Sequence, residues 1–273
     1  MKLSIVTINY NNKVGLQKTI DSVICQTWKD YEWIIIDGGS TDGSKALIEQ
    51  YQQNFAYWCS EPDKGIYHAM NKGIQKAKGK YLQFLNSGDT LHSSQVLEQV
   101  FAETLEDDII YGELRYVTKD SRWIVRYPQK LTLHYFLCQS IGHPASFIKA
   151  TLFKENEYRE DFKIISDWYN FYLWFRDGKS FRKIDVVIAD YDTTGISSVN
   201  IDQINHERDV VFNELFGEEN RKFIEESVLL QKIYEDVKGY GILPLNKYGH
   251  KRQIILRNFI KILNKTVKNH GLS

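Results

Sequence analysis

The sequence has few cysteines, no long apolar run and, in its last part, no acidic residues. Its three cysteines are scattered and form no Cys-x-x-Cys pair, which argues against a disulfide framework and against a zinc site. No apolar run approaches the ~20 residues that a membrane-spanning helix needs. The first residues lack the apolar region of a signal peptide. We therefore expect a cytoplasmic protein.

Acidic residues are absent after Asp236, and the segment that follows carries eight basic residues. On a helical wheel its apolar residues cluster on one side, with Arg257, Lys261 and Lys265 opposite. This pattern is typical of a helix that lies on an anionic membrane surface, here the inner face of the plasma membrane. It also suits packing on the chain's own acidic body or on a second copy in a homodimer, and both alternatives stay open. Nothing else indicates nucleic-acid binding.

The first 90 residues alternate strand-like and helix-like patterns. Apolar runs at 3–8, 33–36 and 81–85 predict buried strands, and amphipathic spacing predicts helices at 16–24, 46–51 and 66–77. Strands that alternate with helices form right-handed βαβ units with a mainly parallel sheet. The sequence therefore predicts a Rossmann-like α/β domain.

The pattern changes from about residue 109. Two strand-like segments, 109–117 and 123–127, flank a polar turn and predict a β-hairpin. Helices are expected near 131–138, 167–177 and 202–235, with a strand at 184–188. We expect a catalytic domain over residues 1–200 and a C-terminal helical region with a basic amphipathic tail over 201–273.

Polar loops follow the predicted strands, where ligands bind in parallel α/β sheets. Asp37 ends the second predicted strand and could accept the imide N–H of a uracil base; the alternative is a turn that caps the next helix. Asp89 follows the third and could hold a divalent cation together with diphosphate oxygens, or simply belong to a turn. Between them, Asp63, Asn71 and Lys72 could contact a nucleotide from a turn and a helix face expected to be exposed.

Four blocks of the sequence carry a family resemblance: 4–11, 37–42, 63–73 and 85–89. In this order they resemble the family 2 glycosyltransferases of GT-A fold, particularly bacterial enzymes of surface-polysaccharide assembly of the colanic-acid type. The resemblance continues through 142–145, 165–168 and 194–198, and so covers roughly the first 200 residues.

This resemblance implies metal-dependent, inverting transfer of a sugar from a nucleotide-sugar, by analogy a UDP-sugar, to a hydroxyl of a glycan or lipid-linked acceptor. Asp167 would be the catalytic base, and Asp89 would bind Mn²⁺ or Mg²⁺. His143 could approach the metal or the donor sugar, or be structural. The nucleotide-sugar would contact Thr7, Asn9, Tyr10, Asp37, Gly38, Ser40, Asp63, Asn71, Lys72, Asn86 and Ser87.

The sequence departs from the family pattern at two points. Ser87, or Asn86 if the loop shifts by one residue, replaces the first acid of the family's Asp-x-Asp motif. The first block also lacks the proline that often precedes its Tyr-Asn pair. A single carboxylate can still bind a cation with phosphate oxygens and water, so Asp89 remains the expected protein ligand.

Rival functions are separated by particular residues. A dinucleotide-dependent oxidoreductase needs Gly-x-Gly-x-x-Gly after its first strand, where this chain has Asn-Tyr-Asn-Asn at 9–12. A non-catalytic carbohydrate-binding protein descended from a transferase is the stronger rival, and the presence of both Asp89 and Asp167 argues against it. Trp168, Tyr169 and Trp174 have helical spacing and are either an acceptor platform or helix core.

Overall fold

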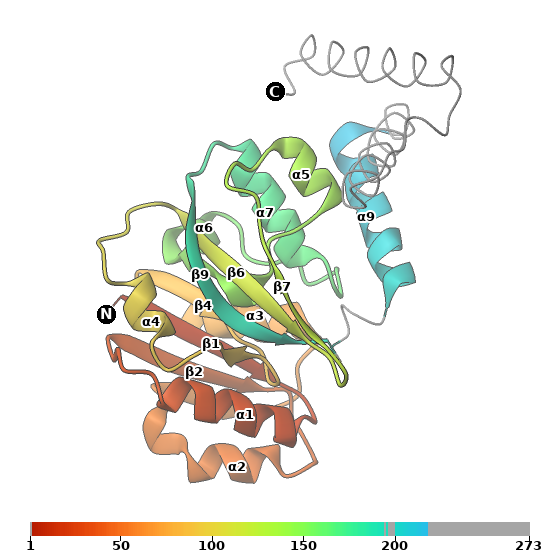
Figure 1. Cartoon of the computed structure of the whole chain (residues 1–273). Coiled ribbons are helices and arrows are strands. Elements are labelled where there is room, and N and C mark those ends of the chain that lie inside the picture. Colours follow the sequence, from red (N-terminus) through yellow and green to blue (C-terminus); the bar gives the residue numbers. More distant parts are fainter. Residues whose placement is uncertain (1, 194, 196–199, 218–273) are drawn as a thin grey trace, which may run out of the picture. The chain divides into compact units, whose positions relative to one another are not determined.

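A computed structural model describes residues 2–193, 195 and 200–217 (Figure 1). The chain divides into two compact units. The first comprises Met1–Gln129 and Ile141–Arg208, and the second comprises Lys130–Ser140 and Asp209–Ser273. The basic tail expected to bind a membrane lies outside the described residues. No helix among those that are described is both long and apolar enough to span a bilayer.

The described part of the chain alternates strands and helices as follows. The strands are β1 (Leu3–Asn9), β2 (Tyr31–Asp37), β3 (Tyr57–Ser60), β4 (Tyr81–Phe84), β5 (Thr90–Leu91), β6 (Ile109–Val117), β7 (Arg122–Val125), β8 (Ser146–Lys149) and β9 (Phe181–Asp192). The α-helices are α1 (Lys13–Ile24), α2 (Ser44–Gln50), α3 (Ile66–Lys76), α4 (Val96–Val100), α5 (Leu133–Cys138), α6 (Ala150–Glu155), α7 (Ser166–Arg176) and α9 (Ile201–Phe216). The short 3₁₀ helices are η1 (Gln52–Asn54) and η2 (His143–Ala145).

All of these strands join one mixed sheet in the first unit, in the order β3-β2-β1-β4-β8-β6-β9-β5, with β7 paired to β6. The half from β3 to β4 is parallel. β8 then runs antiparallel between β4 and β6, and β9 is again parallel to β6. The carboxyl ends of β1, β2, β3, β4, β6 and β9 therefore meet at one edge, which confirms the expected α/β architecture.

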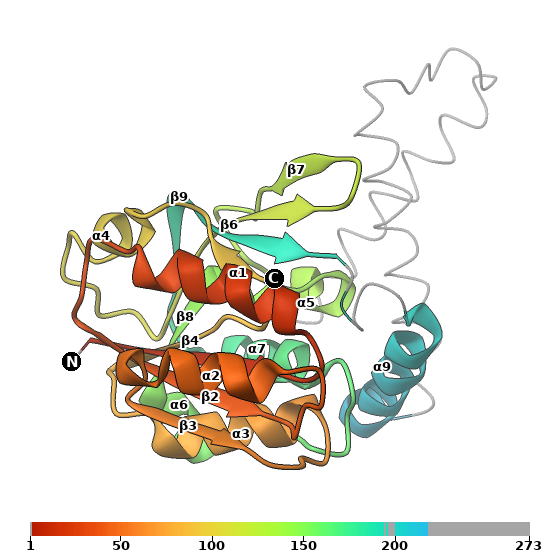
Figure 2. The same cartoon turned by 90° about the horizontal axis from the view of Figure 1, so that it is seen from below.

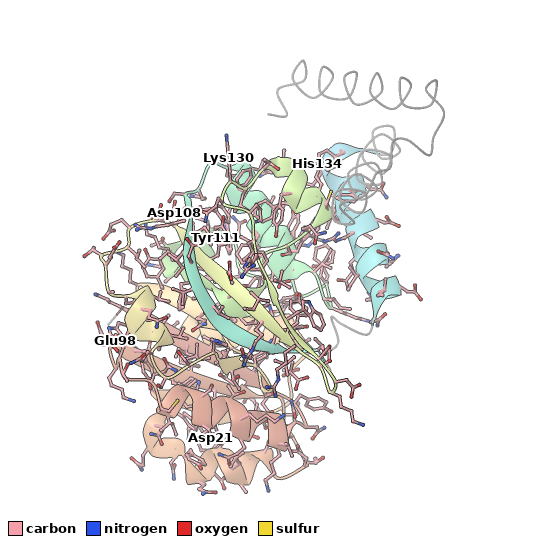
Figure 3. The ribbon with its side chains drawn as sticks, in the orientation of Figure 1. Asp21, Glu98, Asp108, Tyr111, Lys130 and His134 are labelled. Atoms are coloured by element: carbon pink, nitrogen blue, oxygen red, sulfur yellow. The ribbon has the colours of Figure 1, made fainter. Side chains whose placement is uncertain are left out.

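Helices cover this sheet (Figures 1 and 2). The strand order steps to β2 and β3 on one side of β1 and to β4 on the other, so right-handed crossovers place α3 on the opposite face from α1 and α2. A Cβ on Gly73 of α3 would lie 2.3 Å from a methyl group of Val6, so the lack of a side chain lets α3 approach β1 closely. In Figure 3, Tyr111 belongs to the buried core, whereas Asp21 and Glu98 are exposed.

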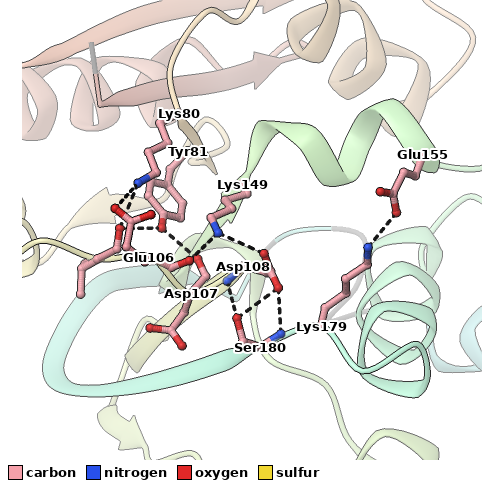
Figure 4. Close-up of polar contacts among 10 residues, drawn as sticks. Lys80, Tyr81, Glu106, Asp107, Asp108, Lys149, Glu155, Lys179 and Ser180 are labelled. Carbon is pink, nitrogen blue, oxygen red and sulfur yellow. Dashed lines mark hydrogen bonds and ion pairs between the residues drawn. The ribbon is translucent and has the colours of Figure 1, made fainter.

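The amino ends of β4, β6 and β9 are tied together by charged side chains (Figure 4). Asp108 accepts hydrogen bonds from Ser180 N and Oγ, at 3.0 and 3.1 Å, and pairs with Lys149 at 3.1 Å. Lys80 pairs with Glu106 at 2.8 Å. With Lys149 at the end of the antiparallel β8, these contacts join four strands at the edge away from the carboxyl ends of the parallel strands.

The sequence missed three short strands. β3 has four half-buried residues and no alternation, and β5 and β8 have two and four residues, respectively. Their extended form depends on neighbours distant in sequence, such as the pairing of Leu82 with Ile148. The strand of 81–85, expected to be the third, is the fourth along the chain. In the second unit, Thr132 caps α5 by accepting a hydrogen bond from Tyr135 N at 3.0 Å.

Candidate active site

Asp37, the last residue of β2, is fully buried and binds three neighbouring loops together. Its Oδ1 accepts hydrogen bonds from Asn9 Nδ2 at 2.7 Å and Ser40 Oγ at 2.6 Å. Its Oδ2 accepts from Ser40 N at 3.0 Å and Ser60 Oγ at 2.6 Å. Burial alone would raise the pKa of Asp37, but these hydrogen bonds outweigh it and lower the pKa. Both oxygens of the carboxylate therefore accept hydrogen bonds from within the protein.

Three predicted nucleotide-binding residues do lie together at Gly38. A Cβ on this residue would be 2.5 Å from Asp63 Oδ2 and 3.2 Å from the ring of Tyr10. Asp63 is fixed by its Oδ1, which accepts from Gly65 N at 2.9 Å. Tyr10 is 67% exposed, unusual for so large a ring. An exposed ring beside a fixed carboxylate can stack on a base and accept hydrogen bonds from a nucleoside.

The Asn86–Asp89 loop follows β4 and is fixed by buried contacts with α1. Gly88 has φ +106°, which favours glycine, and its N–H donates to Thr19 Oγ1 at 3.0 Å. The Thr19 hydroxyl in turn donates to Asp89 O at 2.7 Å. The Ser87 side chain is half-buried, and its backbone N–H donates to Ile8 O at 3.0 Å. These contacts hold the loop against the end of β1, beside the Asp37 loop.

Asp89 is a buried carboxylate with an acidic neighbour. Its Oδ1 accepts from Asp192 N at 3.0 Å, and Asp192 Oδ2 lies 3.3 Å from the position of a Cβ on Gly88. Burial raises the pKa of Asp89 to about 7, against the opposing effect of the His143 charge. On the same loop, Asn86 Oδ1 is buried without a hydrogen-bond partner among the described residues. Such oxygens fit a hard divalent cation, which enzymes often bind through one or two carboxylates plus substrate phosphates.

The candidate metal site has few protein ligands. Within the described ranges no three His, Cys, Asp or Glu side chains gather closely enough to hold an ion by themselves. His143, the other predicted ligand, uses both ring nitrogens within the protein: Nδ1 lies 3.0 Å from Asp167 Oδ2 and Nε2 lies 3.1 Å from Asn86 Nδ2. These contacts fit the structural role that was the open alternative for His143.

Asp167, in the first turn of α7, is held by Tyr67 and His143. Tyr67 Oη lies 2.8 Å from Asp167 Oδ1 and also contacts Ile164 O at 2.5 Å. His143 Nδ1 lies 3.0 Å from Asp167 Oδ2, so each carboxylate oxygen has one of these two partners. Burial alone would raise the pKa of Asp167, but the hydrogen bonds and charge of His143 and the hydroxyl of Tyr67 lower it. The carboxylate is thus ionised at neutral pH.

Thr7 and Lys72, which were also expected to contact the nucleotide-sugar, have hydrogen-bond or ion-pair partners within the protein. Thr7 is fully buried, and its hydroxyl accepts a hydrogen bond from the indole of Trp33 at 3.0 Å, so it does not line an open pocket. Lys72 pairs with Glu61 at 2.7 Å rather than standing free for phosphates. Asn9 is also buried, although its Oδ1 has no hydrogen-bond partner among the described residues.

Asn71 is buried, not exposed as expected, because the segment before α7 covers it. Its Nδ2 donates to Tyr158 O at 2.8 Å and its Oδ1 accepts from Tyr158 N at 3.0 Å. Glu160 adds a third contact at 3.1 Å. The Asn71 amide therefore fixes the chain that leads to Asp167.

Two residues of the site were missed from the sequence. Tyr67 lies in the helix predicted at 66–77, and nothing in its spacing indicates that its hydroxyl reaches Asp167. Asp192 ends β9 at the same edge as Asp37. Extending the predicted strand at 184–188 to its polar end would have found it. Trp168 and Trp174 are core residues of α7, not an acceptor platform, because both are buried.

Comparison with known proteins decides the family. The model of the Glycosyl transferase family 2 matches residues 4–177. The chain belongs to this family. It is accordingly an enzyme, a glycosyltransferase, as the sequence predicted.

Two relatives and two solved structures illustrate the family likeness. An uncharacterized glycosyltransferase of Mycobacterium tuberculosis is 36% identical over 233 residues, covering 81% of this chain and 85% of the relative. A PGL/p-HBAD biosynthesis glycosyltransferase of Mycobacterium bovis is 28% identical over 209 residues, covering 73% and 80%. S. aureus TarS in complex with UDP has a TM-score of 0.62 at 18% identity, covering 84% of this chain and 71% of that one. The mannosyltransferase PcManGT of Pyrobaculum calidifontis, solved with GDP-Man and Mn²⁺, has a TM-score of 0.55 at 13% identity, covering 70% and 56%. The two structures share the GT-A-like fold with this chain.

Proposed function

We propose that this family 2 glycosyltransferase moves a sugar from a nucleotide-sugar to a hydroxyl of a glycan or lipid-linked acceptor, with inversion at the anomeric carbon. The observation that carries the proposal is the Asp167 carboxylate, held by Tyr67 and His143 and linked through Asn86 to the Asp89 loop. A single displacement needs a base for the acceptor hydroxyl and stabilisation of the leaving diphosphate, and Asp167 and the Asp89 loop are the candidates for these two roles.

The nucleoside would bind at Gly38, between the ring of Tyr10 and the carboxylate of Asp63. UDP is the first nucleotide to test, because the TarS structures with which this chain shares its fold contain UDP and UDP-GlcNAc. The PcManGT structure contains GDP-Man, so a guanosine donor belongs in the same test. Asn9 Oδ1, buried and unpartnered among the described residues, is a further acceptor for a nucleoside N–H or O–H.

Asp89, with Asp192 beside it, would hold Mn²⁺ or Mg²⁺ together with the donor's phosphates. Such an ion neutralises the charge of a departing diphosphate. The protein's own part is to keep the Asp89 carboxylate buried and immobile through Asp192 N and the fixed Asn86–Asp89 loop.

The chemical step needs one proton transfer. Asp167 takes the proton of the acceptor hydroxyl while that oxygen bonds to the anomeric carbon. The bond between this carbon and the diphosphate oxygen breaks, and the nucleoside diphosphate leaves. His143 and Tyr67 keep both oxygens of Asp167 in place and the carboxylate ionised, so that its remaining lone pairs can face the hydroxyl.

The experiment separates this function from that of a non-catalytic carbohydrate-binding protein. The protein is incubated with UDP- and GDP-sugars, with and without Mn²⁺ or Mg²⁺, and thermal stabilisation and donor hydrolysis are measured. We expect one donor to stabilise the protein and to be hydrolysed only with the cation, with the freed sugar in the inverted configuration by NMR. Asp89→Ala should abolish the effect of the cation. Stabilisation without any hydrolysis would support the binding protein instead.

We also propose that the basic segment after Asp236 binds the anionic inner face of the plasma membrane, where a lipid-linked acceptor would be presented. The proposal rests on the sequence alone, on basic and apolar residues that occupy opposite sides of a helical wheel. Co-sedimentation with anionic liposomes should be lost when the chain is truncated after Tyr240. Equal sedimentation of both proteins would leave the tail with a role in packing on the enzyme or in a homodimer.

A further inference from the structure

Three aromatic rings lie side by side across β7, β6 and β9, and we call them the aromatic ladder: Trp123, Tyr116 and Tyr191. Strand register places Tyr116 opposite both of the others. Trp123 stacks on Tyr116 with ring centroids 5.5 Å apart and an interplanar angle of 21°. Tyr191 meets Tyr116 edge-on at 5.0 Å. Cross-strand aromatic pairs of this kind form a rigid apolar surface.

The ladder borders the active site. Leu114 lies on the same face of β6 as Tyr116, two residues away, and contacts the position of a Cβ on Gly142 at 2.6 Å, next to His143. Tyr191 directly precedes Asp192, whose N–H donates to Asp89. Burial raises the pKa of Tyr116, and the nearby charges of Tyr191 and Asp89 raise it further. The ladder therefore lies next to the Asp89 loop.

Exposure distinguishes the outer end of the ladder from core aromatics. Trp123 is 46% exposed, and among the described residues only Trp123 and Tyr10 are aromatic side chains with large exposed fractions. Tyr10 lies at the end of β1, in the half of the sheet assigned to the nucleoside. Trp123 lies beyond β4 and β8, in the other half. The two exposed rings thus belong to different halves of the sheet.

We infer that the aromatic ladder is the acceptor subsite of this enzyme and binds a pyranose ring of a glycan through the C–H face of the sugar. This inference rests on the proposed function, since an acceptor must reach Asp167 from the side that the nucleotide leaves open. A sugar ring fits because Trp123 presents an exposed aromatic ring at the outer end of the ladder.

The test compares two neighbours on β7. Trp123→Ala removes the exposed ring, Trp123→Phe keeps an aromatic face, and Ile124→Ala is the matched control. Ile124 is 41% exposed and pairs in register with Arg115, on the opposite face of the strand. Binding of methyl glucoside, galactoside, mannoside and N-acetylglucosaminide is measured by saturation-transfer NMR with UDP and Mn²⁺ present. In parallel, stabilisation by UDP and Mn²⁺ reports on the donor site.

We expect at least one glycoside to bind the wild type, and Trp123→Ala to weaken it by about fivefold or more, the scale of one aromatic stacking contact. Trp123→Phe should retain most of the affinity, and Ile124→Ala should retain all of it. Stabilisation by UDP should be the same in all four proteins.

If UDP stabilises the wild type but no glycoside binds, or Trp123→Ala binds as tightly as wild type, the subsite is disproved while the proposed function stands. Loss of liposome binding by Trp123→Ala without loss of glycoside binding would assign the ring to a membrane instead. Failure of UDP to stabilise the wild type would instead count against the proposed function.

Discussion

At the scale of single residues, Gly38 has the least room for a side chain in the nucleoside half of the site. A methyl group there would lie 2.5 Å from Asp63 Oδ2, so Gly38→Ala should displace that carboxylate. We predict that the variant binds UDP about tenfold more weakly, a loss of about 1.4 kcal/mol, measured by calorimetry with Mn²⁺ present. Its melting temperature without ligand should change little, because Asp63 is only half-buried.

A double-mutant cycle checks the reason for this loss. If Gly38→Ala acts only by displacing Asp63, the double variant Gly38→Ala/Asp63→Ala should bind UDP as weakly as Asp63→Ala alone. Losses that add in the double variant would mean that the methyl group obstructs the nucleotide directly.

The partners of the Asp37 carboxylate are a feature that the sequence alone does not predict. Asp37 was selected because it ends a strand, and the structure places it there. The sequence could not reveal that Asn9, Ser40 and Ser60, from three different strand ends, use both of its oxygens. A carboxylate that organises loops and one that binds a ligand look alike in a sequence, because the difference depends on partners that are distant along the chain.

At the scale of elements, one buried side chain connects α3 to the segment before α7. Asn71 forms both backbone hydrogen bonds of Tyr158, so Asn71→Ala would leave a buried N–H and a buried C=O unpaired. Each such group costs about 1–3 kcal/mol, so the free energy of unfolding should fall by roughly 2–5 kcal/mol in urea denaturation. Turnover should fall as well, because the loosened segment leads to Asp167.

The adjacent residue provides the control. Lys72 lies on the same helix, and Lys72→Ala removes only its surface ion pair with Glu61. The urea midpoint of this variant should therefore stay close to that of the wild type. Equal destabilisation by the two variants would show that substitution in α3, rather than the Tyr158 contact, is responsible.

Elements were predictable where the pattern was long and local. The strand at 3–8, the helix at 66–77 and the hairpin from 109 agree with the structure within a few residues. The sequence did not predict the short strands β3, β5 and β8. Two to four residues carry no periodicity, and these segments are extended only because they pair within the sheet. The predicted exposure of Asn71 was wrong for a related reason, because the segment that buries it comes 87 residues later in the chain.

At the scale of the whole catalytic sheet, its two edges have different roles. The ionic network of Asp108, Lys149 and Ser180 joins strands at one edge (Figure 4). At the other edge, the proposed nucleoside half, the Asp89 loop and the aromatic ladder follow the strand order from β3 to β9. The sequence predicted the α/β class because each βαβ unit is local. It could not give the antiparallel insertion of β8, and therefore could not place Asp192 or the ladder beside Asp89.

The central claim is that Asp167 is the base for sugar transfer, and Asp167→Asn tests it most directly. Asparagine keeps the size of the side chain but cannot accept the proton. We predict that turnover at saturating donor falls by about 10²–10⁴-fold, whereas the affinity for UDP with Mn²⁺ stays unchanged. Asp161→Asn, at an exposed carboxylate paired with Arg159, should keep wild-type turnover. Near wild-type turnover by Asp167→Asn would contradict the assignment of the base.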